Sequence, residues 1–198
     1  LVGLAMGARD RDRRRTRVLV SAIEHDSGLD VAPALRDRGF EVRTLPPSRA
    51  GVVDPETLRG MLGTDVGLVS VMAANNETGV LQPVGELARI AHGAGALFYT
   101  DAAQGFGKVE LDVRNCDAVG VVGHKIGAPV GTGALCVRMR VPLRPVMHGG
   151  GQERGIRPGT QDVRGALALA AAARVSCARL AETRRVVAAR AERLYGRV

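Results

Sequence analysis

The most reactive side chains of this sequence stand directly after short apolar runs that are typical of β-strands. Four such runs are followed by an imidazole, an amide, a carboxylate with a second amide, and a histidine–lysine pair. In chain order these groups are His25, Asn76, Asp101 with Gln104, and His124 with Lys125. Ligands of a parallel sheet bind where the carboxyl ends of the strands meet, so we expect these side chains to form one site.

A lysine in such a cluster can form a Schiff base with a carbonyl compound, and pyridoxal 5'-phosphate is the carbonyl that proteins most often bind in this way. The sequence contains only two lysines, Lys108 and Lys125, and Lys125 belongs to the cluster. Asp101 could pair with the protonated pyridine nitrogen, and a hydrogen bond to a charged partner is worth roughly 1.5–3 kcal/mol. The sequence therefore predicts a cofactor site built around Lys125 and Asp101.

The other members of the cluster match the remaining parts of this cofactor. His25 offers a flat partner for the ring face, and His124 with nearby glycines suits the phosphate. Asn76 and Gln104 supply hydrogen-bond donors for the ring oxygen. Taken singly, each residue also has a structural explanation as a surface residue, a helix cap or part of a turn, so the interpretation rests on all four strand ends together. The pattern indicates no metal site.

Apolar runs of strand length alternate with segments of helical spacing along most of the chain. Strands are predicted at residues 17–21, 40–45, 66–72, 96–100, 118–122 and 133–137. Helices are predicted at residues 29–38, at 54–62 with Asp54 as the N-cap, at 83–92, and over 161–194 as one long helix or two joined ones. This alternation predicts an α/β fold with a mostly parallel sheet and helices on both faces.

The composition fits a globular protein rather than a disordered or membrane-spanning one. The chain has 198 residues, of which 45% are hydrophobic, and no apolar run reaches the roughly 18 residues of a transmembrane helix. The three cysteines, Cys116, Cys136 and Cys177, form no CxxC pair, and we expect each to be structural. An odd number of thiols suits a reducing compartment, so a cytoplasmic location is expected.

The basic charge leaves a nucleic-acid-binding module open as an alternative. The net charge is +8, and six arginines fall between Arg9 and Arg17. A solvated basic segment is the more ordinary interpretation of this stretch. Aromatic residues make up only 3% of the chain, so platforms for base stacking are scarce.

The polar cluster stands in motifs that resemble those of the cysteine desulfurases, which are class V aminotransferase-like enzymes. The motifs are ANNETGVLQPV, TDAAQGFGK, GHKIGAPVGTGAL and HGGGQERGIRPGT, in this order. The resemblance implies the large domain of a fold-type I enzyme that uses pyridoxal 5'-phosphate. It also implies L-cysteine as the substrate, a homodimer with shared active sites, no membrane contact, and sulfur-acceptor proteins that serve iron–sulfur cluster assembly or tRNA thiolation.

The resemblance assigns roles to the residues nearest the cofactor ring. Lys125 would hold the cofactor covalently and later move protons at the substrate Cα. His25 would stack on the pyridine ring and assist proton transfer, and Asp101 would pair with the ring nitrogen.

The resemblance also assigns the polar contacts around the ring. Gln104 would bind the phenolate oxygen, and Asn76 would lie beside that oxygen and the substrate carboxylate. His124 would reach the phosphate. Thr160 would contact the phosphate held by the neighbouring subunit, which makes the site shared across a dimer interface.

Two positions depart from the family pattern. Val122 stands where the family has a hydroxyl residue, two positions before the histidine of GHK, and a lost phosphate hydrogen bond costs roughly 0.5–1.5 kcal/mol. Pro158 replaces a serine two positions before Thr160. Proline fixes φ and removes an N–H, so it could misplace Thr160.

The resemblance covers residues 17–165 and, more weakly, the rest of the chain. It predicts a cofactor-binding portion over residues 1–165 and a long helix over 166–198 that leads toward a smaller domain. The family's persulfide-forming cysteine and substrate-binding arginine belong beyond that helix, so we expect an incomplete fold without desulfurase activity of its own. Another class V aminotransferase, a selenocysteine lyase-like enzyme and a decayed pseudo-enzyme remain as alternatives.

Overall fold

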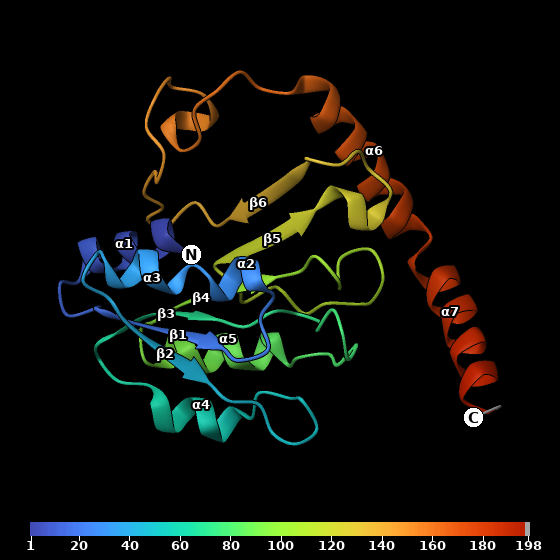
Figure 1. The fold of residues 1–198 in the computed structure, drawn as a ribbon, viewed down its shortest axis with the longest axis horizontal. Helices are drawn as coiled ribbons and strands as arrows, with labels where there is room; N and C mark the ends of the chain where they lie inside the picture. The colour runs from blue at the N-terminus through green and yellow to red at the C-terminus, as the bar shows by residue number, and fades with distance from the viewer. Residues whose placement is uncertain (197–198) are drawn as a thin grey trace.

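The centre of the molecule is a six-stranded sheet, seen in the computed structural model, which describes residues 1–196 (Figure 1). The strands are β1 (Arg17–Ser21), β2 (Glu41–Leu45), β3 (Val66–Ser70), β4 (Leu97–Asp101), β5 (Ala118–Val122) and β6 (Gly133–Val137). Their order is β2-β1-β3-β4-β5-β6, and every neighbouring pair is parallel except β5 with β6. The predicted α/β fold with a mostly parallel sheet is confirmed.

Helices cover both faces of this sheet, as predicted. One face carries α1 (Val2–Arg11), α2 (Asp26–Leu29) and α3 (Ala32–Arg36), and the other carries α4 (Pro55–Met61) and α5 (Val84–Gly93). The chain continues through the short helices η1 (Gly123–Ile126) and η2 (Glu153–Gly155) to α6 (Val163–Ala178) and α7 (Leu180–Tyr195). In Figure 1, α7 projects away from the sheet. Within the described part of the chain, none of the helices combines the length and apolar character needed to cross a membrane.

Alternate side chains of the strands feed two hydrophobic cores. Leu19 and Phe98 are buried in the core beneath α4 and α5, whereas Val18 and Val20 are buried in the core beneath α1 and α3. Successive strand residues point to opposite faces, and both faces of this sheet are covered. The strands therefore appear in the sequence as continuous apolar runs rather than as alternating patterns.

The first helix, α1, has no counterpart among the predicted elements. Glycine lowers helix propensity, but Gly3 and Gly7 let the segment at 142–144 lie directly against α1. A methyl group at Gly7 would sit 1.6 Å from the carbonyl oxygen of Pro142, and one at Gly3 would sit 2.3 Å from that of Arg144. Tertiary packing, rather than local propensity, therefore selects this helix.

The single helix predicted at 29–38 is wrong, because the structure has two short helices there. α2 ends at Leu29 and α3 begins at Ala32. Pro33 lies in the first turn of α3, where a residue without an N–H is tolerated, but it cannot continue a helix that starts upstream. The helical pattern over 161–194 forms two joined helices, which is one of the two predicted forms, and they meet at Arg179.

The arginine-rich segment is anchored to the fold. The guanidinium of Arg15 donates to the carbonyl oxygens of Val66 and Ala94, each at 2.8 Å, and its side chain is only 14% exposed. Arg9 lies over an aromatic ring, and Arg17 forms ion pairs with two carboxylates. These contacts occupy cationic groups that a nucleic-acid-binding surface would need, so they favour a structural interpretation of the segment.

Replacing Arg15 by methionine removes two hydrogen bonds from a largely buried guanidinium. We expect the free energy of unfolding to fall by about 2–3 kcal/mol, measured by urea denaturation. The control is Arg114→Met, which removes an exposed guanidinium paired with Asp112 and should leave the denaturation midpoint unchanged. Equal midpoints for the two variants would contradict the anchoring role of Arg15.

Candidate cofactor site

Parallel pairing brings four strand ends to the same edge of the sheet. Ser70 of β3 pairs with Tyr99 of β4, and Asp101 of β4 pairs with Gly120 of β5. The segments that follow β1, β3, β4 and β5 therefore leave the sheet on one side. These four segments carry most of the residues that the sequence predicts for the site.

Asp101 is the last residue of β4, whereas the prediction ended this strand at Thr100. The strand is one residue longer because Asp101 pairs with Gly120 of β5. The carboxylate of Asp101 is half-buried, and its Oδ1 accepts a hydrogen bond from the Ala103 N–H at 2.8 Å. This bond fixes the carboxylate at the start of the segment that carries Gln104.

A second carboxyl group, that of Glu24, lies near Asp101 and was not assigned a role from the sequence. Its side chain is buried, and its Oε1 accepts a hydrogen bond from the Met72 N–H at 2.5 Å. Burial raises the pKa of Glu24 to about 8; the Met72 hydrogen bond opposes this rise, and the negative charge of Asp101 adds to it. Folding therefore favours the protonated form of Glu24, and its hydrogen bond to Met72 ties the segment after β1 to the end of β3.

The sequence held one signal for Glu24, which was its place directly before His25 at a strand end. His25 itself is exposed and caps the N-terminus of α2, where its Nδ1 accepts a hydrogen bond from the Ser27 N–H at 3.1 Å. That bond assigns the proton of the neutral ring to Nε2. The buried carboxyl of Glu24 thus fixes the segment on which the imidazole stands.

Asn75, rather than Asn76, builds the turn after β3. The Oδ1 of Asn75 accepts hydrogen bonds from the N–H groups of Glu77 and Thr78, and its Nδ2 donates to the Ile23 carbonyl at 2.9 Å. Asn76 is exposed on this turn. Asn75 therefore positions Asn76 and also ties the turn to the segment that carries His25.

Gln104 and the two lysines form a second polar group at this edge. The Nζ of Lys108 donates to Oε1 of Gln104 at 2.7 Å. Burial lowers the pKa of Lys108, and the nearby positive charge of Lys125 lowers it further. Lys125 is exposed in η1, directly after β5. A methyl group at Gly107 would lie 3.3 Å from Ile126 in η1, so the segment after β5 lies close to the segment after β4.

His124 and Thr160 are less closely connected to this group. His124 is exposed beside Lys125 in η1, and Thr160 is exposed in the segment before α6. Within residues 1–196, no hydrogen bond or ion pair joins either residue to the other predicted site residues. Thr160 lies in the segment between η2 and α6, and Gly165 near the start of α6 packs against Thr132, which precedes β6. The structure therefore gathers the residues that follow β1, β3, β4 and β5 at one edge of the sheet.

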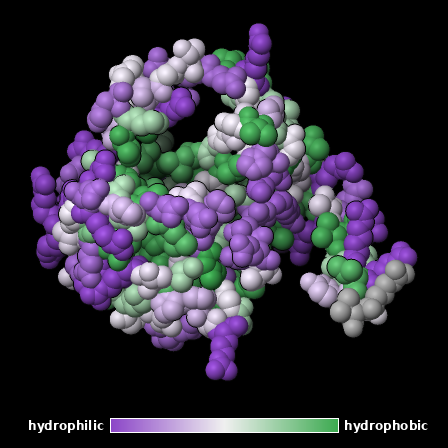
Figure 2. Space-filling model, in the orientation of Figure 1, coloured by the Kyte–Doolittle hydropathy of each residue, from purple (hydrophilic) through white to green (hydrophobic). Residues whose placement is uncertain are grey.

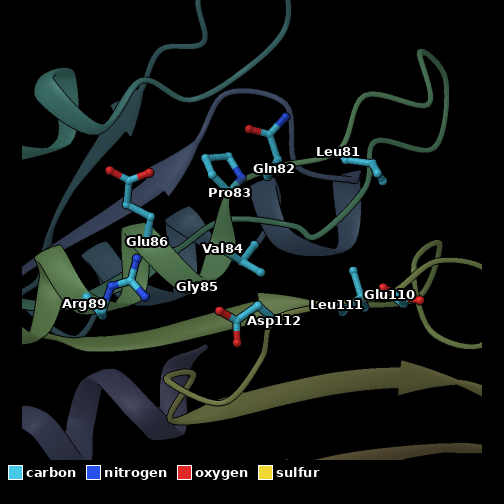
Figure 3. A pocket seen from close by; sticks show the side chains of 10 residues that line it. All are labelled: Leu81, Gln82, Pro83, Val84, Gly85, Glu86, Arg89, Glu110, Leu111 and Asp112. Atoms are coloured by element: carbon cyan, nitrogen blue, oxygen red, sulfur yellow. The ribbon is translucent and has the colours of Figure 1, made fainter.

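Two cavities of the structure are lined by other residues. A cavity of about 310 Å³ lies between the start of α5 and residues 110–112, with Arg89 and Asp112 among its lining side chains (Figure 3). A second cavity, of about 280 Å³, is lined by Cys116 and Cys136 among others. Neither cavity is lined by a predicted site residue.

The cysteines differ in their surroundings. Burial raises the pKa of the Cys116 thiol to about 12, and the charges of Asp117 and Asp112 add to the rise while that of Arg138 opposes it. A buried thiol that stays protonated is unreactive, which fits a structural role for Cys116. Cys136 and Cys177 are exposed. The apolar sequence of β6 therefore does not bury it, and Figure 2 shows hydrophobic side chains on the surface near the loop that follows this strand.

The groups at this edge fit the chemistry of pyridoxal 5'-phosphate. An exposed primary amine can react with an aldehyde, and a half-buried carboxylate can hold a protonated ring nitrogen. Lys125 and Asp101 supply these groups from neighbouring strands, and the imidazole and amides needed around a ring stand on the adjoining segments. Val122 is half-buried at the end of β5 and offers no hydroxyl group to a phosphate.

Comparisons with known proteins place the chain in a family. Residues 3–198 match the class-V aminotransferases, and the chain belongs to this family. It is 38% identical over 194 residues to the cysteine desulfurase IscS of Methanosarcina thermophila. The aligned residues make up 97% of this chain and 47% of that protein. It is 47% identical over 176 residues to cysteine desulfurase IscS of Anaeromyxobacter dehalogenans (strain 2CP-C), which covers 86% and 43% of the two chains.

Solved structures give the same fold. The crystal structure of DndA from Streptomyces lividans matches with a TM-score of 0.83 and 43% identity, covering 91% of this chain and 53% of that chain. SspA, solved in complex with cysteine, matches with a TM-score of 0.77 and 31% identity, covering 87% and 53%. The chain therefore spans about half the length of the relatives it matches.

The buried carboxyl of Glu24 makes stability depend on pH. Because its pKa is raised from 4.5 to about 8 in the folded chain, folding favours the protonated form, and its contribution to stability is lost as the pH rises from about 4.5 to about 8. Glu24→Gln keeps an acceptor for Met72 and removes the charge. We expect the variant to match the native chain near pH 4.5 and to exceed its free energy of unfolding by roughly 3–5 kcal/mol near pH 8.

This difference is measured by urea denaturation of both chains at several pH values. Glu77→Gln, which removes an exposed carboxylate, is the control and should show no such trend. A gain from Glu24→Gln that stays constant between pH 4.5 and pH 8 would show that Glu24 ionises normally in the folded chain.

Proposed function

We propose that this chain is the cofactor-binding part of a pyridoxal 5'-phosphate-dependent cysteine desulfurase. The whole protein would convert L-cysteine to L-alanine and pass the sulfur to a cysteine of the enzyme and then to acceptor proteins. The observation that carries the proposal is the packing of Gly107, in the segment that follows Asp101 and Gln104, against Ile126 beside Lys125 at the carboxyl edge of a parallel sheet. The cysteine desulfurases among the relatives and the cysteine bound by SspA support this substrate.

The chemistry divides between the cofactor and the residues of this chain. When bound, the cofactor supplies an aldehyde and a ring that stabilises negative charge at the substrate Cα. The amine of Lys125 would hold the aldehyde, and once released it would move a proton at that Cα. Asp101 keeps the ring nitrogen protonated. Burial raises the pKa of the neighbouring carboxyl of Glu24, so Asp101 would be the group that pairs with the ring nitrogen.

The remaining site residues orient the cofactor and the substrate in this proposal. His25, exposed at the start of α2, covers the face of the ring. Gln104 donates to the ring oxygen, and Asn76, on the turn built by Asn75, lies beside that oxygen and the substrate carboxylate. His124 reaches the phosphate.

The proposal includes a homodimer in which Thr160 of each subunit contacts the phosphate of the other. Two features support it. Thr160 is exposed, and within residues 1–196 no hydrogen bond joins it to the other site residues of its own chain. Apolar side chains near β6 are also exposed, with Leu135 49% and Met147 55% accessible. Three further points stay predictions. The first is the division into a cofactor-binding portion at 1–165 and a connecting helix over 166–198. The others are the acceptors for iron–sulfur cluster assembly or tRNA thiolation and a cytoplasmic location.

Reductive trapping tests the central claim. The chain is incubated with pyridoxal 5'-phosphate and reduced with borohydride, and the modified peptide is identified by mass spectrometry. We expect the adduct on Lys125, because its amine is exposed and stands at the edge that carries Asp101. Lys125→Ala should lose the adduct, and Lys108→Arg should keep it. Labelling of Lys108, or no labelling of a chain whose circular dichroism shows that it is folded, would refute the assignment.

A further inference from the structure

The amide of Gln104 is held from one side by a group that can only donate. The ammonium of Lys108 has three N–H donors and no acceptor, and its Nζ lies 2.7 Å from Oε1 of Gln104. An amide has one oxygen and one NH2 group on opposite branches. Because Lys108 binds the amide oxygen of Gln104, the NH2 group of that amide points away from Lys108.

Without such a partner, the two orientations of a glutamine amide differ little in energy, and only the hydrogen-bond partners decide between them. The orientation matters for the proposed function, because a ring oxygen that carries negative charge needs a donor. An amide turned by 180° would present its own oxygen to that negative charge and would repel it. A fixed donor-only group behind the amide excludes this orientation.

The segment that carries Lys108 is itself held firmly. The N–H groups of Lys108 and Val109 both donate to the Gly105 carbonyl at 3.1 Å. Gly107 has a φ of +70°, and a methyl group there would lie 2.7 Å from Cβ of Ser176 in α6 and 3.3 Å from a methyl group of Ile126 in η1. This turn is therefore packed against α6 and against the helix that carries Lys125.

We propose that Lys108 is a positioning residue, which binds Oε1 of Gln104 and thereby directs the NH2 group of that amide toward the ring oxygen of the cofactor. The inference rests on the proposed function for the identity of the ligand, but the hydrogen bond itself belongs to the chain alone. The position of Lys108 agrees with this role, because its side chain is half-buried beside Gln104 rather than in open solvent.

The test compares Lys108→Met, which keeps the aliphatic stem, with Lys108→Arg, which is also a donor without an acceptor. Arg49→Met, which removes an exposed positive charge, is the control for net charge. In the chain without cofactor, the heteronuclear NOE of the glutamine side-chain amides is measured after labelling of glutamine with ¹⁵N. The chain has four glutamines, Gln82, Gln104, Gln152 and Gln161, and Gln104→Ala identifies the resonance of Gln104. Binding of pyridoxal 5'-phosphate is then titrated by absorbance.

We expect the Gln104 amide to be rigid in the native chain, the Lys108→Arg variant and the Arg49→Met control, and mobile in Lys108→Met. The apparent Kd for pyridoxal 5'-phosphate should rise roughly threefold to tenfold in Lys108→Met and stay within twofold of the native value in Lys108→Arg. A rigid Gln104 amide in Lys108→Met, an unchanged Kd in that variant, or an arginine variant that behaves like the methionine variant would overturn the inference.

The two readouts also separate this inference from the proposed function. If the native chain binds no pyridoxal 5'-phosphate, the proposed function fails, and the mobility of the Gln104 amide still decides whether Lys108 positions it. If the native chain is trapped on Lys125 and the Kd does not change in Lys108→Met, the proposed function stands and the inference is wrong.

Discussion

Parallel hydrogen bonding between β1, β3, β4 and β5 is the constraint on which the candidate site depends. Parallel strands must all end at the same edge, so the four segments that follow them are forced together although their polar residues are 20 positions or more apart in the chain. The apolar helices on both faces hold this register, because a slip of one residue would exchange the two cores. The antiparallel strand β6 ends the arrangement, since it returns the chain to the opposite edge.

Two carboxyl groups and two ammonium groups lie at this edge, and the surroundings of each pair make its two members differ. Glu24 and Asp101 bring two carboxyl groups close together, and burial raises the pKa of the first of them. Lys108 and Lys125 bring two ammonium groups close together; the first binds the Gln104 oxygen and the second is exposed. The arrangement leaves one carboxylate and one accessible amine, which are the groups that a protonated ring and an aldehyde require. The same edge is therefore suited to a ligand that carries both.

The sequence predicted the helices and strands that depend on interactions between residues close together in the chain. Asp54 caps α4 by accepting a hydrogen bond from the Thr57 N–H, as its type and the following proline indicate. The strands were found because their side chains are apolar on both faces. Helix α1 was not found, because its glycines are unfavourable for a helix taken alone and favourable only where residues 142–144 approach it. Glu24 was not assigned a role, because no sequence pattern indicates that its side chain is buried and accepts a hydrogen bond from the Met72 N–H.

The sequence by itself determined the fold class and the types of group at the strand ends, because strand and helix periodicity and residue chemistry are local properties. It also carried the motifs that resemble the cysteine desulfurases, and the family match agrees with them. Only the tertiary structure decided that burial raises the pKa of Glu24, which asparagine builds the turn and which atom of the Gln104 amide meets Lys108. Those features depend on burial and on contacts between segments far apart in the chain, and no local pattern specifies either.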